Sequence, residues 1–283
     1  MNLSKDVERT RIGFMQGRLS PIRNNRIQSF PWEDWSTEFA IAHSLDLPIM
    51  EWTIDSERFD ENPLITSTGQ ETIRSLLEVH ELTIPSVTCD YFMENPFWAA
   101  GRIESKKALI KIIEGMSSIH ARYLVIPLVD NSSLPETIES EAKDFFFELA
   151  EILKKNNVLI AFESDFAPKK LGEFISDFDP QFFGINYDMG NSASLAFIPE
   201  EEFAEYGDRI INVHVKDRIR FGNTVPLGTG DTDFKSVFLG LNNLSYEGNY
   251  ILQAARDQNG NHAEAVEMYA KFVANLMRST LSD

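Results

Sequence analysis

The chain has 283 residues, of which 43% are hydrophobic and 25% are charged, and its formal net charge is -18 at neutral pH. This acidity argues against a nucleic-acid-binding protein, because binding to phosphates needs a basic surface. No apolar run approaches the roughly 20 residues that a membrane helix requires. The chain has one cysteine, Cys89, which excludes an internal disulfide.

The amino-terminal segment and the cysteine content favour a location in the cytoplasm. Residues 1–18 are charged and lack the apolar stretch of a secretory signal peptide. A single cysteine is compatible with a reducing compartment. We therefore expect a soluble cytoplasmic protein that binds neither membranes nor nucleic acids.

Short apolar runs rich in β-branched residues alternate with stretches of helical periodicity along the whole chain. The expected strands span residues 11–17, 47–53, 82–89, 123–129, 158–164, 183–189, 211–217 and 249–255. The expected helices span residues 32–45, 71–81, 104–120, 135–157, 171–178, 199–207, 233–243 and 262–279. No linker rich in proline, glycine or serine divides the chain, so we expect one domain over residues 1–283.

This alternation predicts an α/β protein with a parallel sheet. Eight βα repeats favour a closed (β/α)8 barrel, the TIM barrel, over an open doubly wound sheet. An open sheet that binds a dinucleotide would carry a glycine-rich turn after its first strand. Gly17 is the only glycine in residues 15–21, so the glycine-rich fingerprint is missing.

Four polar side chains lie at or near the ends of the last four expected strands: Glu163, Asp188, His214 and Gln253. In a parallel barrel the carboxyl ends of all strands meet at one mouth, where the chemistry takes place. Carboxylates combined with one histidine suit Mn, Mg, Co, Fe or Zn. Such an ion can stabilise the enediolate that forms when the C–H beside a carbonyl loses its proton. This is the chemistry of sugar isomerisation and epimerisation.

Each of these residues also has a structural interpretation. Glu163 could be an ion-pair partner, Asp188 a turn former or helix cap, and His214 a hydrogen-bonded core residue. Taken singly, each structural interpretation is the commoner one. Independent caps and ion pairs, however, have no reason to fall on four successive strands, so the set favours one shared site.

Four motifs carry a resemblance to a known family. They are MEWTID at 50–55, YDMGNSAS at 187–194, HVKDR at 214–218 and VPLGTGDTDF at 225–234. Through them the chain resembles the xylose isomerase-like superfamily of sugar isomerases and epimerases. Within it, the chain is most similar to the ketose-phosphate (hexulose- and pentulose-phosphate) 3-epimerases. The resemblance spans most of the chain.

The resemblance implies a metal held by Glu163, Asp188 and His214, with a fourth ligand on the last strand. In the family that ligand is a glutamate, which also acts as a catalytic acid or base. Here the position is Gln253, whose amide oxygen can bind a metal but cannot take a proton near neutral pH. We assign the catalytic positions to Glu163 and Gln253.

This departure leaves three interpretations open. Glu163 could act as the single base, as in an isomerase. Another carboxylate could replace the missing acid, with Glu51, Asp90 and Glu94 as candidates. Alternatively, the chain could bind a sugar without converting it.

Four cationic residues lie near the predicted mouth: Lys216, Arg218, Arg220 and Arg256. They favour an anionic substrate such as a sugar phosphate, although ordinary mixing of charges on the surface explains them equally well. Backbone amides at Gly228 and Gly230 are expected to approach a phosphate, unless that loop is only a flexible connection. Trp98 belongs to an aromatic segment that suits either a lid or an oligomer contact. The expected substrate contacts are Arg18, Glu51, Asn191, Lys216, Arg218, Arg256 and Trp98.

The leading hypothesis is therefore a divalent-metal-dependent isomerase or epimerase of a small ketose or ketose phosphate. The alternatives are a non-catalytic carbohydrate-binding barrel, or a dehydratase that uses the same site. A metal-dependent DNA-repair endonuclease of the same fold ranks last, because such enzymes carry more histidines at their strand ends. A homodimer that pairs through the barrel mouths is the expected assembly, if the protein associates with itself.

Overall fold

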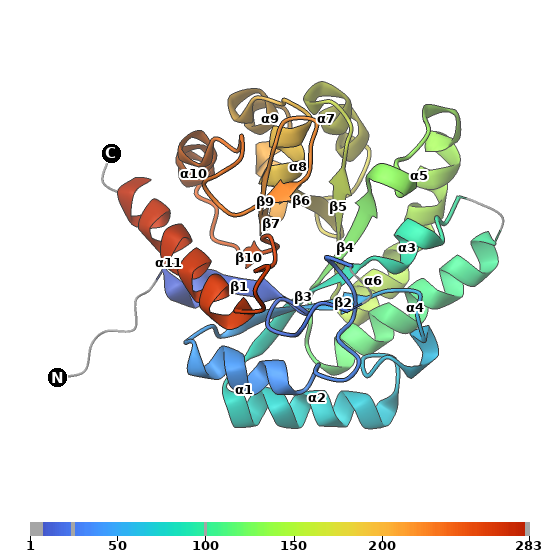
Figure 1. Cartoon of the computed structure of the whole chain (residues 1–283). Coiled ribbons are helices and arrows are strands. Elements are labelled where there is room, and N and C mark those ends of the chain that lie inside the picture. Colours follow the sequence, from blue (N-terminus) through green and yellow to red (C-terminus); the bar gives the residue numbers. More distant parts are fainter. Residues whose placement is uncertain (1–7, 24–25, 99–100, 281–283) are drawn as a thin grey trace.

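The fold was analysed in a computed structural model that describes residues 8–23, 26–98 and 101–280. Within these residues, eight parallel strands close into a barrel, in which β1 pairs with β2 on one side and with β10 on the other. Helices surround the strands on the outside (Figure 1). The predicted (β/α)8 barrel is thus confirmed. Residues 1–7, which carry part of the prediction about the amino terminus, lie outside the described ranges.

All eight expected strands are present with slightly shorter bounds. The barrel strands are β1 (Ile12–Met15), β2 (Ile49–Ile54), β3 (Thr83–Cys89), β4 (Tyr123–Leu128), β5 (Leu159–Ser164), β6 (Phe183–Asp188), β7 (Ile210–Val215) and β10 (Tyr250–Leu252). A short antiparallel hairpin, β8 (Asp217–Arg218) with β9 (Thr224–Val225), follows β7 and was not expected.

The predicted α-helices occur in the predicted order, and two short helices that were not predicted, α3 (Tyr91–Glu94) and α8 (Met189–Ser194), are added to them. The others are α1 (Thr37–Ser44), α2 (Ser67–His80), α4 (Arg102–Ser118), α5 (Glu139–Phe147), α6 (Ala150–Asn156), α7 (Pro168–Ser176), α9 (Pro199–Tyr206), α10 (Phe234–Asn243) and α11 (His262–Thr280). No helix among the described residues is long and apolar enough to cross a membrane.

One long helix was predicted over residues 135–157, but the structure has two. The helices α5 and α6 are separated at Glu148 and Leu149, and the first residues of the range form a 3-10 turn at Glu136–Ile138. Neither proline nor glycine occurs in residues 136–157, so the sequence carries no local signal for a break at residues 148 and 149. The interruption accompanies the complete burial of Leu149 between the two helices.

The space between the barrel and its helices is filled by phenylalanine side chains. Phe97, Phe146 and Phe162 are nearly completely buried, and the ring of Phe146 lies 4.7 Å from that of Phe97 and 4.8 Å from that of Phe162, centroid to centroid. Burial of each such side chain is worth roughly 2 kcal/mol. This layer fixes α5 against β5 and so holds the strand that carries Glu163.

The interior of the barrel changes from apolar to polar along the strands. Met15, Ile49 and Ile251 form a small apolar cluster, and a Cβ atom at Gly13 would lie 2.5 Å from Ile49. Two residues after Ile49, Glu51 bonds to side chains from two other strands, β3 and β7. The carboxyl half of the barrel is therefore a buried polar site built on an apolar base.

Candidate active site

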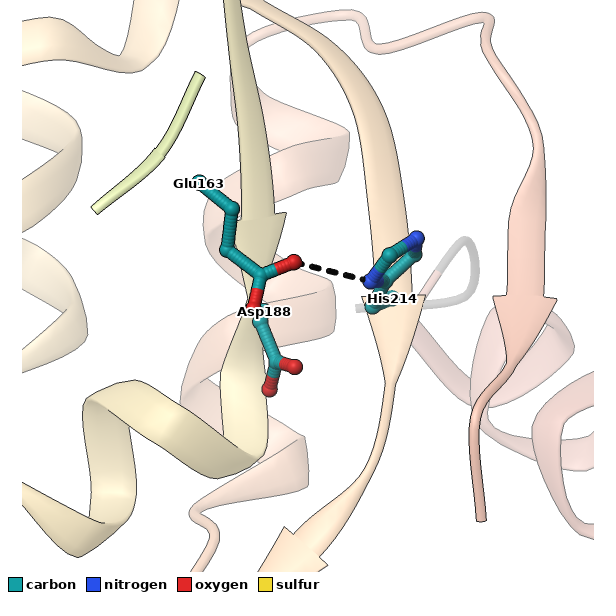
Figure 2. Close-up of side chains that lie close together, drawn as sticks. All are labelled: Glu163, Asp188 and His214. Atoms are coloured by element: carbon teal, nitrogen blue, oxygen red, sulfur yellow. Dashed lines mark ion pairs between the residues drawn. The ribbon is translucent and has the colours of Figure 1, made fainter. Parts of the chain in front are cut away.

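Glu163, Asp188 and His214 converge at the carboxyl end of the barrel, as predicted. They come from the adjacent strands β5, β6 and β7, and Asp188 pairs directly with His214 in the sheet register. One ligand atom from each lies within 4.8 Å of the others, and all three side chains are buried. Figure 2 shows the three side chains close together, with the carboxylate of Glu163 facing the ring of His214.

His214 is held by a carboxylate on each side. Its Nε2 lies 2.7 Å from Glu51 Oε1, and its Nδ1 lies 3.2 Å from Glu163 Oε2. Burial alone would lower the pKa of His214, but the charges and hydrogen bonds of Glu51 and Glu163 outweigh it and raise the pKa to about 10. A metal ion would take the place of the proton on Nδ1, while Glu51 fixes the tautomer through Nε2.

The prediction that Glu51 contacts the substrate is wrong, because this side chain lies inside the barrel. It is completely buried, and its two oxygens accept hydrogen bonds from Ser86, Thr88, Asn212 and His214. Burial opposes ionisation, yet His214 and the hydroxyl donors lower the pKa of Glu51 below its ordinary value. A carboxylate has about four acceptor positions, so none is left for a sugar. Glu51 positions His214 instead.

Two asparagines complete this network and were missed in the sequence. Asn212 Nδ2 donates to Glu51 Oε2 at 2.9 Å and to Asn186 Oδ1 at 2.8 Å, and Asn186 Nδ2 donates to Glu163 Oε2 at 2.8 Å. Each lies two residues before a predicted ligand, Asp188 or His214, and so faces the same side of its strand. That alternation was the signal available to find them.

Asn191 fixes the second oxygen of Glu163. Its Nδ2 donates to Glu163 Oε1 at 2.7 Å. Its Oδ1 accepts hydrogen bonds from Lys216 Nζ at 3.2 Å and Arg218 Nη1 at 2.8 Å. These two cations fix which way the amide points, so Glu163 is oriented by amides on both oxygens.

The interpretation of Asp188 as a helix cap is confirmed, and its role as a metal ligand stays a prediction. Its Oδ1 accepts the backbone N–H of Asn191 and caps α8, at a distance of 2.8 Å. Its Oδ2 lies 3.2 Å from Lys216 Nζ. Capping uses one oxygen and leaves the other facing the site.

Gln253 lies one residue beyond β10 and is 9% exposed. Its Oε1 accepts a hydrogen bond from Lys216 Nζ at 3.1 Å, and the same ammonium contacts Asp188. The side chain therefore reaches the predicted site. The ammonium of Lys216 donates its three hydrogen bonds to Asp188, Asn191 and Gln253. It therefore links the oxygens around the site.

The two other arginines join the chain segments around the mouth. Arg18 Nε donates to the carbonyl of Ala254 at 3.0 Å, Arg18 Nη1 donates to that of Ile27 at 2.9 Å, and Arg256 Nη2 donates to that of Ser20. Burial and then the charge of Arg256 lower the pKa of Arg18 to about 9. Contact of either arginine with a substrate stays a prediction.

The interpretation of Gly228 and Gly230 as phosphate-binding residues is wrong. The backbone amides of Gly228, Thr229 and Gly230 all donate to Asp217 Oδ2, at 2.8 to 3.1 Å, and that of Thr232 donates to Oδ1. A Cβ at residue 230 would lie 2.3 Å from Asp217, which explains the glycine. The loop closes on a buried carboxylate of its own chain.

Trp98 packs onto the barrel rather than standing in solvent. Its ring meets that of the buried Phe97 edge-on, with centroids 4.7 Å apart. Residues 99 and 100, the next part of the aromatic segment, lie outside the described ranges. A role of Trp98 in substrate binding stays a prediction.

The amino-acid sequence also shows which protein family the chain belongs to. The sequence profile of the family described as xylose isomerase-like TIM barrel matches residues 39–272. The chain belongs to this family. No curated protein matches the chain significantly.

Solved structures support the same fold. L-ribulose 3-epimerase is 12% identical with a TM-score of 0.73, and the match covers 96% of each chain. A family protein from Mycobacterium smegmatis in complex with magnesium is 15% identical, with a TM-score of 0.72 over 97% of this chain and 99% of that one. The IOLI protein with a bound zinc atom is 14% identical, with a TM-score of 0.70 and 96% coverage of each chain. At these identities the likeness shows the fold alone.

The residues present fit a divalent metal. Two carboxylates and an imidazole with its outer nitrogen anchored by Glu51 are the donor set that Mn, Mg, Co or Zn prefers. The amide oxygen of Gln253 is available as a neutral fourth donor if Lys216 gives way to the ion. Glu163, Asp188 and His214 are thus the residues that would hold it.

Proposed function

We propose that the protein is a divalent-metal-dependent isomerase or epimerase of a small ketose or ketose phosphate, acting through an enediolate. The observation that carries the proposal is the convergence of Glu163, Asp188 and His214 on one buried point at the barrel mouth. The magnesium and zinc complexes among similar structures and the epimerase among them support it.

Glu163 is the residue we assign as the base. Asn186 and Asn191 each donate to one of its oxygens, which holds the carboxylate in a single orientation. A divalent ion held by Glu163, Asp188 and His214 would act as a Lewis acid toward the substrate carbonyl and so acidify the neighbouring C–H. Glu163 would remove that proton. Its return to the neighbouring carbon gives the isomer, whereas protonation of the original carbon on the other face by a second donor gives the epimer.

Lys216 and Arg218 are the residues we assign to the substrate's polar end. Both already share the Oδ1 atom of Asn191, so a substrate oxygen or phosphate that reaches them would also bind next to Glu163. Gln253 would contribute its amide oxygen to the ion or to a substrate hydroxyl. It carries no charge and moves no proton.

The test is proton exchange followed by NMR in deuterated water. The purified protein is loaded with Mn or Mg, freed of excess paramagnetic ion, and offered ketopentoses, ketohexoses and their phosphates. We expect deuterium to enter the substrate next to the carbonyl, and Glu163→Gln to abolish the exchange. The product then distinguishes an isomerase from an epimerase. Absence of exchange on every substrate, with metal bound, would contradict the proposal and leave a binding role.

A further inference from the structure

Epimerisation needs a proton donor on the face of the substrate opposite the base, and Gln253 cannot be that donor. If the proposed function holds, another residue must supply the proton that Gln253 cannot. Carboxyl groups that follow the strands at the same mouth are the natural candidates. Four of them in the first half of the barrel are Glu51, Asp55, Asp90 and Glu94.

Three of these carboxyl groups already have structural roles. Glu51 accepts four hydrogen bonds inside the barrel. Asp55 accepts the backbone N–H of Phe30 at 2.8 Å, and its other oxygen is shut off from solvent. Glu94 is 51% exposed, accepts a hydrogen bond from Ser56 and forms an ion pair with Arg26 at 3.7 Å. None of them is free to meet a substrate.

Asp90 is different. It directly follows β3 and occupies the cap position of α3, yet its side chain makes no capping hydrogen bond. Its carboxyl group is hydrogen-bonded to no residue in the described ranges, while the side chain is only partly buried. A carboxyl group at a strand end with accessible, unoccupied oxygens can reach a substrate in the mouth.

The surroundings of Asp90 place it in the site's electrostatic field. Burial raises its pKa to about 7, and the charges of Glu163 and Asp55 act in the same direction, against Arg18 and His214. In the barrel, β4 lies between β3 and β5, so Asp90 and Glu163 reach the same mouth from strand ends that are a quarter of the eight-stranded barrel apart.

We propose that Asp90 is the second catalytic residue, which delivers a proton to the substrate carbon on the face opposite Glu163. In the forward step the carboxylate of Glu163 takes the proton from the C–H bond, and the electron pair of that bond enters the enediolate. The O–H of Asp90 then breaks as a new C–H bond forms on the other face. Glu163 ends protonated and Asp90 ionised, and exchange of both with water restores the starting state.

The experiment separates the two half-reactions with the isosteric variant Asp90→Asn. Metal-loaded protein is offered L-ribulose and the other ketopentoses and ketohexoses in deuterated water. In the wild type we expect deuterium at the reacting carbon of both the starting ketose and its epimer. In Asp90→Asn we expect deuterium still to enter the starting ketose, returned by Glu163, while the rate of epimer formation falls by about 100-fold or more.

The matched control is Glu104→Gln, an exposed carboxylate on α4, which we expect to change neither rate. The melting temperature and the metal affinity of Asp90→Asn are measured as well. Both should equal those of the wild type, which would show that the variant is folded. If Asp90→Asn forms the epimer at the wild-type rate, or loses exchange and epimer formation equally, the assignment is wrong. Loss of the epimer in Lys216→Met but not in Asp90→Asn would assign the proton to the ammonium and also overturn it.

Failure of the proposed function gives a different result. In that case the wild-type protein with metal bound exchanges no proton on any ketose, and Asp90 has no proton to deliver. Exchange in the wild type together with unchanged epimer formation in Asp90→Asn overturns only the role of Asp90.

Discussion

Gln253 is the residue at which the site differs from a four-ligand metal centre with three carboxylates. We predict that Gln253→Glu strengthens Mn²⁺ binding by about tenfold or more, because carboxylate charge is a main determinant of affinity for hard cations. Isothermal titration calorimetry measures the change, with Gln253→Leu as the control that removes the donor oxygen. Equal affinities in all three proteins would show that residue 253 pairs with Lys216 and not with the ion.

Glu51 gives the second prediction at this scale. Its hydrogen bond to His214 Nε2 orients the imidazole and keeps Nδ1 turned toward Glu163. Loss of such an outer partner typically weakens metal binding by about 10- to 100-fold, and we expect this for Glu51→Gln. A competition assay with a chelating dye measures it, and the exposed Glu264→Gln serves as control. An unchanged affinity in folded Glu51→Gln would refute the positioning role.

The convergence of the three candidate ligands could be predicted from the sequence, but the partners that orient them could not. Glu163, Asp188 and His214 each end a recognisable apolar run, and parallel topology alone brings those ends together. Glu51 is 163 residues away from His214 in the chain, and their contact depends on the stagger of strands around a closed barrel. No local pattern encodes that stagger, so Glu51 was assigned to the substrate instead.

At the scale of elements, Asp217 organises the loop between β9 and α10. Four backbone amides from residues 228–232 donate to its carboxylate. We predict that Asp217→Asn lowers the free energy of unfolding by roughly 3 kcal/mol, because bonds to a charged acceptor are lost and an amide N–H₂ faces donors. Urea denaturation measures this, and hydrogen exchange should speed up in residues 228–232. Asp231→Asn, which removes one backbone bond from Arg220, should cost much less.

Glu202 joins α9 to β6 and α8 and makes stability depend on pH. Its buried carboxyl accepts hydrogen bonds from the hydroxyls of Tyr187, Ser192 and Tyr206. Burial raises the pKa of Glu202 above its ordinary value, despite these donors. The folded protein therefore holds this proton more tightly than the unfolded chain does.

The resulting stabilisation is complete below the ordinary pKa of glutamate, about 4.5, and is lost as the pH rises through the raised folded value. We predict that Glu202→Gln, which stays neutral, flattens the decline in urea midpoint between pH 4.5 and 8. The exposed Glu200→Gln on the same helix is the control. A decline as steep in Glu202→Gln as in the wild type would assign the pH dependence to other groups.

The elements themselves were predictable to different degrees. The barrel strands are apolar runs bounded by turn residues, and all eight were found. The break between α5 and α6 and the β8–β9 hairpin were not, because each depends on tertiary contacts. The hairpin holds Asp217 beneath the loop that it binds, and the turn of α8 is capped by the same Asp188 that faces the metal site.

For the whole molecule, the site links parts of the barrel that are far apart in sequence. Its ligands come from β5, β6 and β7, and their positioning groups from β2 and β3, so unfolding of the barrel must disperse the site. A metal that binds only the folded state, present at a free concentration of 100 times its dissociation constant, adds about 2.7 kcal/mol to the free energy of unfolding. In a domain of this size that corresponds to a rise of roughly 5–10 °C in melting temperature.

We predict this rise for the wild type on addition of Mn²⁺ or Zn²⁺ after treatment with EDTA, measured by scanning calorimetry. Asp188→Asn keeps an oxygen to cap α8 but removes the ligand charge, so its metal-free melting temperature should stay close to that of the wild type while the rise on metal addition shrinks. An equal rise in both proteins would place the ion elsewhere on this acidic chain. No rise in the wild type would mean that the three ligands form a hydrogen-bonded polar core instead of a metal centre.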